Sequence, residues 1–271
     1  MRAMIWGSDG YLGWPTAMQL ANLGHDVVGV DNYLKRTLAH EADADLLLEP
    51  HNLPERVRLF AARTGRMIRI GIADLRDPAR AHDLLAHYHP ETVVHYAELD
   101  TDLMQGPVYR PDGDGGDDRL LPALHYDDIF WTVLNRFLVQ TLVVNHPLTV
   151  YGRGEQKRRF LDIRDTLGCV TLALEHPRAP GELRIYNQFT ERVAAAARLL
   201  GLEVRIDHEP NPQMGTEEYL YEVRHEALLE FWLVPHLPTQ ASLVGMLERL
   251  RTYVGRIDGE RLILRVHWRS A

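Results

Sequence analysis

Three glycines spaced three residues apart constrain this chain more than any other feature of its sequence. Gly7, Gly10 and Gly13 follow the apolar run 2–6 and lead into the helical pattern 11–23. A strand, a glycine-rich turn and a helix in that order form a loop whose free amides and helix dipole bind a pyrophosphate. The alternative is a turn that needs glycine only for positive φ angles. The pattern favours a parallel α/β domain with a phosphate-binding loop.

Short apolar runs alternate with longer amphipathic runs in the first hundred residues. This alternation predicts an α/β fold with a doubly wound, Rossmann-like parallel sheet. The expected strands are 2–6, 26–31, 67–72 and 92–96, and further helices are expected at about 36–48, 52–63 and 78–89. Beyond a loop rich in Gly and Asp at 110–118, helices are expected at 127–144, 163–175, 192–200 and 240–251, with a strand at 147–151. The mixture in 182–271 is typical of a small α+β C-terminal lobe.

Acidic residues follow two of the expected strands. Asp31 ends the run 26–31 and lies 24 residues after Gly7, close to the spacing at which an acid binds the adenosine ribose. An acid at this position favours NAD over NADP, whereas the nearby Arg36 could receive a 2′-phosphate. Taken alone, Asp31 could equally cap a turn. Asp74 and Leu75 follow the run 67–72, where dinucleotide-binding folds place an Asp near the adenine.

Charge and composition exclude several classes of protein. Lys and Arg number 30 against 38 Asp and Glu, with no long block of one sign, so we expect no nucleic-acid partner. No apolar stretch approaches the roughly 18 residues of a membrane span, and no signal or transit segment precedes the first strand. Cys169 is the sole cysteine, which excludes an internal disulfide. We expect a cytoplasmic protein.

Histidines and aspartates are numerous, but none has the spacing of a metal site. His82, His87 and His89 lie near Glu91 with Pro90 between them, which is not a zinc pattern. The acidic loop at 112–118 lacks the glutamate that completes a calcium loop. We therefore predict no metal.

Eight segments spread over almost the whole chain share one family pattern. They are GSDGYLGW (7–14), DNYLKR (31–36), VVHYAE (93–98), TDLMQGPVY (101–109), LNRFLVQ (134–140), HPLTVYGRGEQKRRFLDIRDT (146–166), YNQFTE (186–191) and PNPQMGTEEYLYE (210–222). Together they resemble the extended short-chain dehydrogenases/reductases, the NAD-dependent epimerases and dehydratases, and among these the UDP-sulfoquinovose synthase branch. The resemblance implies NAD as cofactor, UDP-glucose as substrate and a sulfite donor as a further partner.

The resemblance also implies which residues bind each ligand. Those expected around NAD are Gly7, Asp9, Gly10, Tyr11, Leu12, Gly13, Asp31, Asn32, Arg36, Asp74 and Leu75. Those expected around the UDP-sugar are Gln105, Arg136, Thr149, Tyr151, Gln156 and Arg158. Arginine is a forked partner for phosphate, although Arg136 and Arg158 could instead form surface salt bridges.

The reactive pair of that family is absent from this sequence. Its Tyr-x-x-x-Lys pattern places a lysine where it lowers the pKa of the tyrosine that takes the sugar proton. No tyrosine here has a lysine four residues on, since Lys35 follows Tyr33 by two and Lys157 follows Tyr151 by six. We therefore predict no catalytic residue.

The same gap shortens the expected sheet. VVHYAE ends at residue 98 and TDLMQGPVY begins at 101, whereas a parallel crossover needs about a dozen residues or more. In the family, roughly 100 residues of βα units separate the two segments. We therefore expect an NAD-binding domain at 1–109, truncated after about residue 98. A nucleotide-sugar region with the C-terminal lobe is expected at 110–271, with parts returning to the sheet.

Several functional alternatives remain open. The first is an NAD-dependent nucleotide-sugar enzyme of the UDP-sulfoquinovose synthase type, impaired or inactive for want of the reactive pair. The second is a non-catalytic remnant that binds NAD and a UDP-sugar, and the third is another NAD-dependent sugar epimerase or dehydratase. Gln213 stands where the family has an arginine beside the substrate, which would weaken substrate binding. A homodimer is a further expectation, although the usual dimer helices fall in the absent segment.

Overall fold

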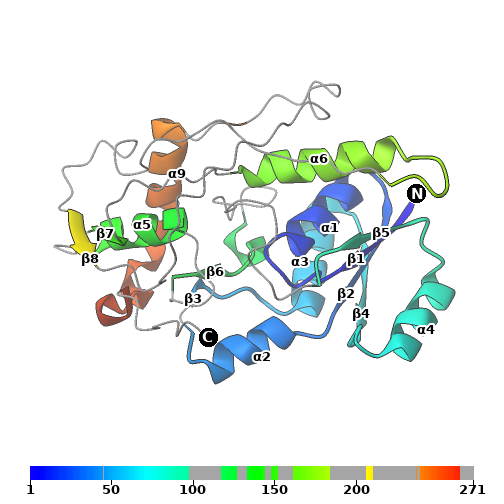
Figure 1. Cartoon of the computed structure of the whole chain (residues 1–271), viewed down its shortest axis with the longest axis horizontal. Helices are drawn as coiled ribbons and strands as arrows, with labels where there is room; N and C mark the ends of the chain where they lie inside the picture. The colour runs from blue at the N-terminus through cyan, green and yellow to red at the C-terminus, as the bar shows by residue number, and fades with distance from the viewer. Residues whose placement is uncertain are drawn as a thin grey trace.

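A four-stranded parallel sheet organises the N-terminal part of the computed structural model, on the right in Figure 1. The structure describes residues 1–44, 46–97, 117–126, 133–143, 148–151, 161–183, 206–209, 236 and 239–262. The strands are β1 (Arg2–Trp6), β2 (Asp26–Asp31), β4 (Ile68–Ile72) and β5 (Thr92–His95), in the order β4-β2-β1-β5. That order is the first half of a doubly wound sheet, so the predicted Rossmann-like α/β fold is confirmed.

Four helices connect these strands, namely α1 (Gly13–Asn22), α2 (Leu34–Glu41), α3 (Leu53–Thr64) and α4 (Pro78–Tyr88). Short polar residues cap the starts of two of them, α3 and α4. The Asn52 side chain accepts from Glu55 N at 3.0 Å at the start of α3, and the Asp77 side chain accepts from Ala79 N at 3.0 Å at the start of α4. Gly65, with φ of +70°, ends α3 in the left-handed conformation.

The two faces of this sheet differ in how completely helices cover them. We call the side packed by α1 and α3 the covered face; α6 (Ile163–Glu175) lies along α1 outside it (Figure 1). Its buried residues are Ala3, Ile5, Trp14, Ala17, Met18, Leu20, Ala21, Val27, Leu53, Phe60, Ile68 and Leu120. We call the other side the thin face; its buried residues are Met4, Val28 and Val30, packed by the partly buried Leu84, Leu85 and Tyr88 of α4.

The prediction of a helix at 36–48 is wrong at its C-terminal end. α2 ends at Glu41, and Asp43 turns the chain with a φ of +49°. Leu46–Leu48 then form a strand, β3, which pairs antiparallel with β6 (Leu124–His125). β6, which is distant in the sequence, gives these leucines a partner for backbone hydrogen bonds and a buried face. Tertiary pairing of this kind outweighs a local preference for helix.

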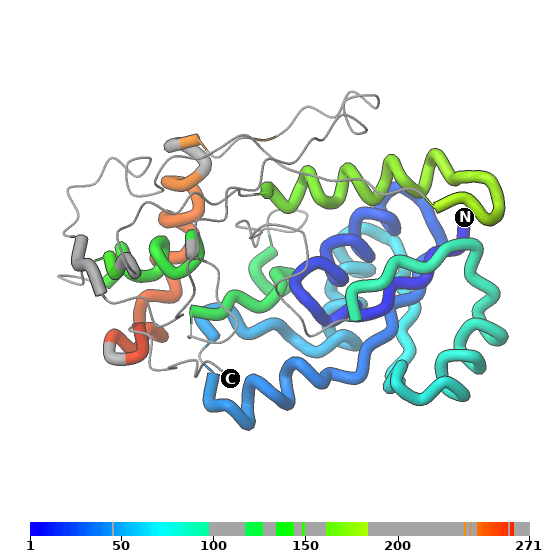
Figure 2. Tube along the Cα trace, in the orientation of Figure 1, coloured from blue at the N-terminus to red at the C-terminus, as the bar shows by residue number. Residues whose placement is uncertain are grey.

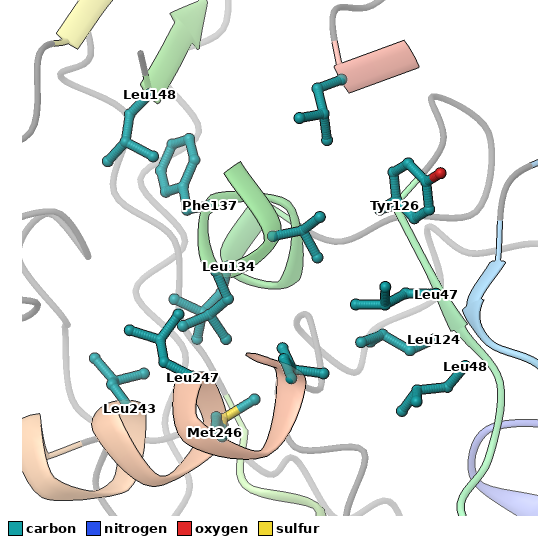
Figure 3. Close-up of a cluster of buried hydrophobic side chains, with 14 of the residues drawn as sticks. Leu47, Leu48, Leu124, Tyr126, Leu134, Phe137, Leu148, Leu243, Met246 and Leu247 are labelled. Carbon is teal, nitrogen blue, oxygen red and sulfur yellow. The ribbon is translucent and has the colours of Figure 1, made fainter. Parts of the chain in front are cut away.

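A second core lies to one side of the sheet, where Figure 1 draws α5 (Val133–Leu142) and α9 (Gln240–Leu250), and Figure 3 shows its side chains. It packs β3 and β6 against these two helices. Leu47 comes from before the shortened join in the sequence, and Leu124, Leu134 and Leu247 come from after it. This core therefore ties the two parts of the chain together.

The remaining elements belong to the later part of the chain (Figure 2). They are η1 (Asp118–Leu120), β7 (Leu148–Tyr151), β8 (Ile206–Glu209), η2 (Arg251–Arg256) and η3 (Gly259–Leu262), and β7 pairs parallel with β8. Of the three described strands after residue 109, β6 pairs with β3 and β7 pairs with β8, in two separate two-stranded sheets. The domain limits at 109 and 110 fall outside the described residues and stay a prediction. No described helix is long and apolar enough to span a membrane.

Candidate functional site

The glycine loop after β1 has a geometry that only glycine tolerates. Gly7 has φ of +80°, and a Cβ there would lie 2.6 Å from the carbonyl carbon of Tyr96. A Cβ on Gly13 would lie 2.0 Å from Gly7 O. The amide of Gly10 donates to that same oxygen at 3.1 Å, which closes the turn. The spacing of the glycines is therefore a steric requirement of the loop.

The start of α1 presents the positive end of the helix dipole to the glycine loop. Leu12 precedes the helix and makes no side-chain cap, and the first turn holds no acidic residue. Trp14 N already donates to Gly10 O at 3.3 Å and Pro15 has no N–H, so the dipole is the main feature of this end that attracts a ligand. An anion such as a pyrophosphate suits it.

Asp31, at the end of β2, joins this loop to the residues that follow the strand. Its Oδ2 accepts from Asp9 N at 2.9 Å and its Oδ1 from Tyr33 N at 2.7 Å. Burial raises the pKa of Asp31, and these backbone hydrogen bonds oppose the shift. Each oxygen of an ionised carboxylate has a second lone pair, so Asp31 can still accept from a ribose hydroxyl.

One cavity of about 710 Å³ brings most of the predicted cofactor residues together, a size typical of ligand sites. The predicted residues that line it are Gly7, Asp9, Gly10, Tyr11, Asp31, Asn32, Arg36, Asp74 and Leu75. Leu12 and Gly13 do not line it. Leu12 packs instead against Ile163 and Leu167 of α6. The loop, the two acids and the glycine geometry suit an adenine dinucleotide.

Asp9 directs its carboxylate to two arginines of the protein. Arg36 Nε donates to Asp9 Oδ2 at 2.6 Å and Arg36 Nη2 to Asp9 Oδ1 at 2.9 Å. Arg56, on α3, also bonds to Asp9 Oδ1. The resemblance implied cofactor contacts for Asp9 and Arg36, and the structure uses both side chains within the protein.

Arg56 is a fully buried cation beneath the phosphate loop. Its guanidinium lies 4.7 Å from the ring centre of Trp14, and its Nε and Nη1 have no hydrogen-bond partner among the described residues. Burial lowers the pKa of Arg56 to about 10, against the opposing effect of Asp9. Asp9 is therefore the counter-ion that makes burial of this arginine tolerable.

Asp74 and Arg76 form an ion pair at the other acidic position. Arg76 Nη2 donates to Asp74 Oδ2 at 2.6 Å, and both residues line the cavity. The hydrogen bonds from Arg76 lower the pKa of Asp74 to about 2. Both arginines that line the cavity are thus paired with aspartates that line it too.

Of the predicted substrate residues, the structure brings Arg136 and Thr149 together. Arg136 Nη2 donates to Thr149 O at 2.9 Å, and both residues are buried. Neither lines the 710 Å³ cavity. Tyr151 is placed by its backbone in β7, while Gln105, Gln156 and Arg158 lie outside the described residues. Their roles stay predictions.

Sequence reasoning missed three contributors to these sites. Gln140 is buried and accepts from Thr149 N at 3.3 Å, and its position one helical turn after Arg136 was the available signal. His125 lines the cofactor cavity from β6, and Arg56 supports the loop from α3. No local signal marks the last two residues, because both depend on tertiary packing.

Comparison with known proteins gives consistent results. The pattern of the NAD dependent epimerase/dehydratase family matches residues 3–105 and 126–187. A chloroplastic UDP-sulfoquinovose synthase of Spinacia oleracea is 28% identical, over 99% of this chain and 79% of the relative. A UDP-sulfoquinovose synthase of Sulfolobus acidocaldarius is 25% identical, over 100% and 98%.

Among solved structures, the UDP-glucose 4-epimerase of Bifidobacterium longum, in complex with NAD+ and UDP, has a TM-score of 0.63 and 15% identity. The match covers 91% of this chain and 97% of the epimerase, and it supports the fold.

The alignment with the spinach relative also measures the shortening. It runs over 383 positions, 112 more than the 271 residues of this chain. At least 112 positions of the relative therefore have no counterpart here, which agrees with a missing block of βα units.

Proposed function

This chain belongs to the NAD-dependent epimerase/dehydratase family, and from that membership we propose that it binds NAD in the cavity at Gly7 and a UDP-sugar nearby. The observation that supports this proposal is the cavity, which is lined by the glycine loop, by Asp31 at the end of β2 and by Asp74 after β4. When bound, NAD supplies a hydride acceptor for a sugar alcohol. UDP-glucose is the proposed sugar nucleotide, with a sulfite donor as the second substrate, by similarity to relatives 25–28% identical.

In this proposal each part of the cavity holds one part of the dinucleotide. The bare backbone at Gly7 and Gly10 admits the pyrophosphate, and the positive end of the α1 dipole faces its charge. Asp31 accepts from the adenosine ribose, and Asp74 with Leu75 borders the adenine. On the sugar side, Arg136 and Thr149 are the described candidates, with Gln105, Tyr151, Gln156 and Arg158 completing the set.

We further propose that the chain turns over slowly or not at all. Removal of hydride from a sugar carbon requires a base for the hydroxyl proton. The family uses a tyrosine with a lysine four residues on, and the two lysines of this chain are Lys35 and Lys157. Neither has the required spacing, so binding without efficient chemistry is the expected behaviour.

Calorimetric titration of the purified chain tests the binding proposal. NAD should bind to the wild type and to Gly245→Ala, since a Cβ at Gly245 meets no atom of the described residues within 4 Å beyond its own helix backbone. It should not bind to Gly7→Ala, whose Cβ collides with the backbone of Tyr96. Failure of the wild type to bind NAD would refute the proposal.

A product assay tests the proposal on turnover separately. UDP-glucose, NAD and sulfite are incubated with the chain, and sulfonated sugar nucleotide is measured by mass spectrometry. Clear turnover would contradict slow chemistry while leaving NAD binding intact. A cytoplasmic location and a homodimer remain predictions from the sequence, and the spinach relative is described as chloroplastic.

A further inference from the structure

Arg36 is held by the protein on every nitrogen of its guanidinium. Besides the two bonds to Asp9, its Nη1 donates to Pro50 O and its Nη2 to His51 O, each at 2.8 Å. The ring of Tyr33 lies 5.6 Å from its Cζ. A forked arginine-carboxylate pair with additional carbonyl acceptors fixes both position and direction. Arg36 therefore lines the cavity without offering it an unengaged cation.

The pairing of Asp9 with Arg56 keeps the Asp9 carboxylate ionised and in place beside Arg36. This carboxylate neutralises Arg56, whose side chain is 0% exposed. An ionised carboxylate beside a buried guanidinium is strongly favoured, because the buried charge has no solvent to replace it. Burial lowers the pKa of Arg36, and the bonds and charge of Asp9 more than offset that effect, so Arg36 stays charged and attached.

A dinucleotide with a 2′-phosphate needs a cation near the acid that follows β2. From the sequence alone, Arg36 is the residue that could supply it. We propose that Asp9 makes the cavity selective for NAD over NADP by binding the guanidinium of Arg36, and this inference rests on the proposed function. Asp31 repels a 2′-phosphate directly, and Asp9 withholds the cation that would compensate for it. Two further cations line the cavity among the described residues. Arg76 is similarly engaged by Asp74, and Lys35 also has a partner.

The test separates these two acids by measuring NAD and NADP affinities in an Asp31→Asn background. Asp31→Asn alone should bind NADP weakly, because Arg36 is still engaged. Adding Asp9→Ala with Arg56→Met should raise NADP affinity by about tenfold or more. The Arg56 change accompanies the Asp9 change so that no buried cation is left unpaired. A further Arg36→Met should remove the gain.

Two additional variants keep the proposal falsifiable if the multiple variant does not fold. Arg36→Met in the Asp31→Asn background leaves the pair of Asp9 and Arg56 intact and should not change NADP affinity. Asp26→Asn removes the partner of Arg69 at the opposite end of β2 and should leave the ratio of NAD to NADP affinity unchanged.

Three results would overturn the inference. One is tight NADP binding by Asp31→Asn alone, and another is a gain that persists without Arg36. The third is a loss of NADP affinity when Arg36→Met is added to Asp31→Asn. In each of these cases the wild type still binds NAD, so the proposed function stands. Absence of NAD binding by the wild type would instead refute the proposed function, and this inference with it.

Discussion

The two faces of the four-stranded sheet carry similar apolar strand residues but receive different cover. Among the described residues, twelve are buried in the cluster on the covered face and three on the thin face. α4, which packs on the thin face, contains no buried residue. Val93 of β5 lies beside Met4 and is 38% exposed. The difference therefore arises from the helices and not from the strands.

This contrast shows which parts of a doubly wound fold depend on one another. A parallel sheet normally has both faces covered by crossover helices, and the strands beyond β5 bring further helices with them. At least 112 positions of a relative have no counterpart in this chain. The cavity lies at the carboxyl ends of β1, β2 and β4, and the glycine loop and both acids are complete there. The cofactor edge thus forms without the second half of the sheet.

The largest expected effect compares a tryptophan from each face. Trp14 is fully buried on the covered face and donates from Nε1 to Leu120 O at 2.9 Å, so Trp14→Ala should cost about 3–5 kcal/mol. Trp6 is partly buried on the thin face, and Trp6→Ala should cost only about 1–2 kcal/mol. Urea denaturation measures both. Equal costs would remove the distinction between the faces.

The second prediction concerns the charged cluster between the covered face and the cavity. Asp9→Ala leaves Arg56 buried and unpaired, and should lower the free energy of unfolding by about 3 kcal/mol. Adding Arg56→Met should restore most of that loss, since an apolar side chain needs no counter-ion. Urea denaturation of the single and double variants provides the comparison. A double variant no more stable than Asp9→Ala would show that the buried charge is not the cause.

The third prediction concerns pH at the cofactor edge. Burial raises the pKa of Asp31, so this carboxylate takes up its proton at a higher pH than a free aspartate, whose pKa is about 3.9. Protonation removes an acceptor for the ribose, so NAD affinity should weaken as pH falls through the raised pKa. The change should approach about 1.4 kcal/mol per pH unit below it. Calorimetry across the acidic range tests this, and Asp31→Asn should flatten the profile.

The smallest effect is expected from a polar pair on the thin face. Arg69 Nη2 donates to Asp26 Oδ2 at 2.6 Å, with both side chains about half exposed, and its guanidinium lies 5.2 Å from the ring centre of Tyr88. Asp26→Asn should cost about 0.2–1 kcal/mol, and less at high salt. Thermal unfolding at two salt concentrations measures it. A cost of several kcal/mol would mean that this pair, and not apolar packing, holds the thin face.

Features with a local cause were predictable from the sequence. β1 and β2 and the helix at 163–175 have the expected limits, because apolar periodicity and capping residues specify them directly. The loop at Gly7 and the acid at Asp31 were predictable for the same reason, since a strand, a turn and a helix in order determine their geometry.

Features that depend on distant partners were not predictable. The leucines of β3 fall within the helix expected at 36–48, and their strand forms because Leu124 and His125 pair with them. The resemblance gave Asp9 and Arg36 as cofactor residues, yet Arg56 and the carbonyls after β3 engage their charges. The spacing of residues in a sequence does not predict which of several nearby groups an arginine will bind.

The pairing of β3 with β6 links ligand binding to the stability of distant parts of the fold. Leu46 of β3 and His125 of β6 both border the cavity, and Leu47 and Leu124 reach the core that contains α5 and α9. A ligand seated there would be bounded by stretches of chain that lie on either side of the shortened join. By mass action, occupancy would then protect the C-terminal helices against unfolding as well as the nucleotide loop. Hydrogen exchange of α9, none of whose residues lines the cavity, becomes a sensitive reporter of binding.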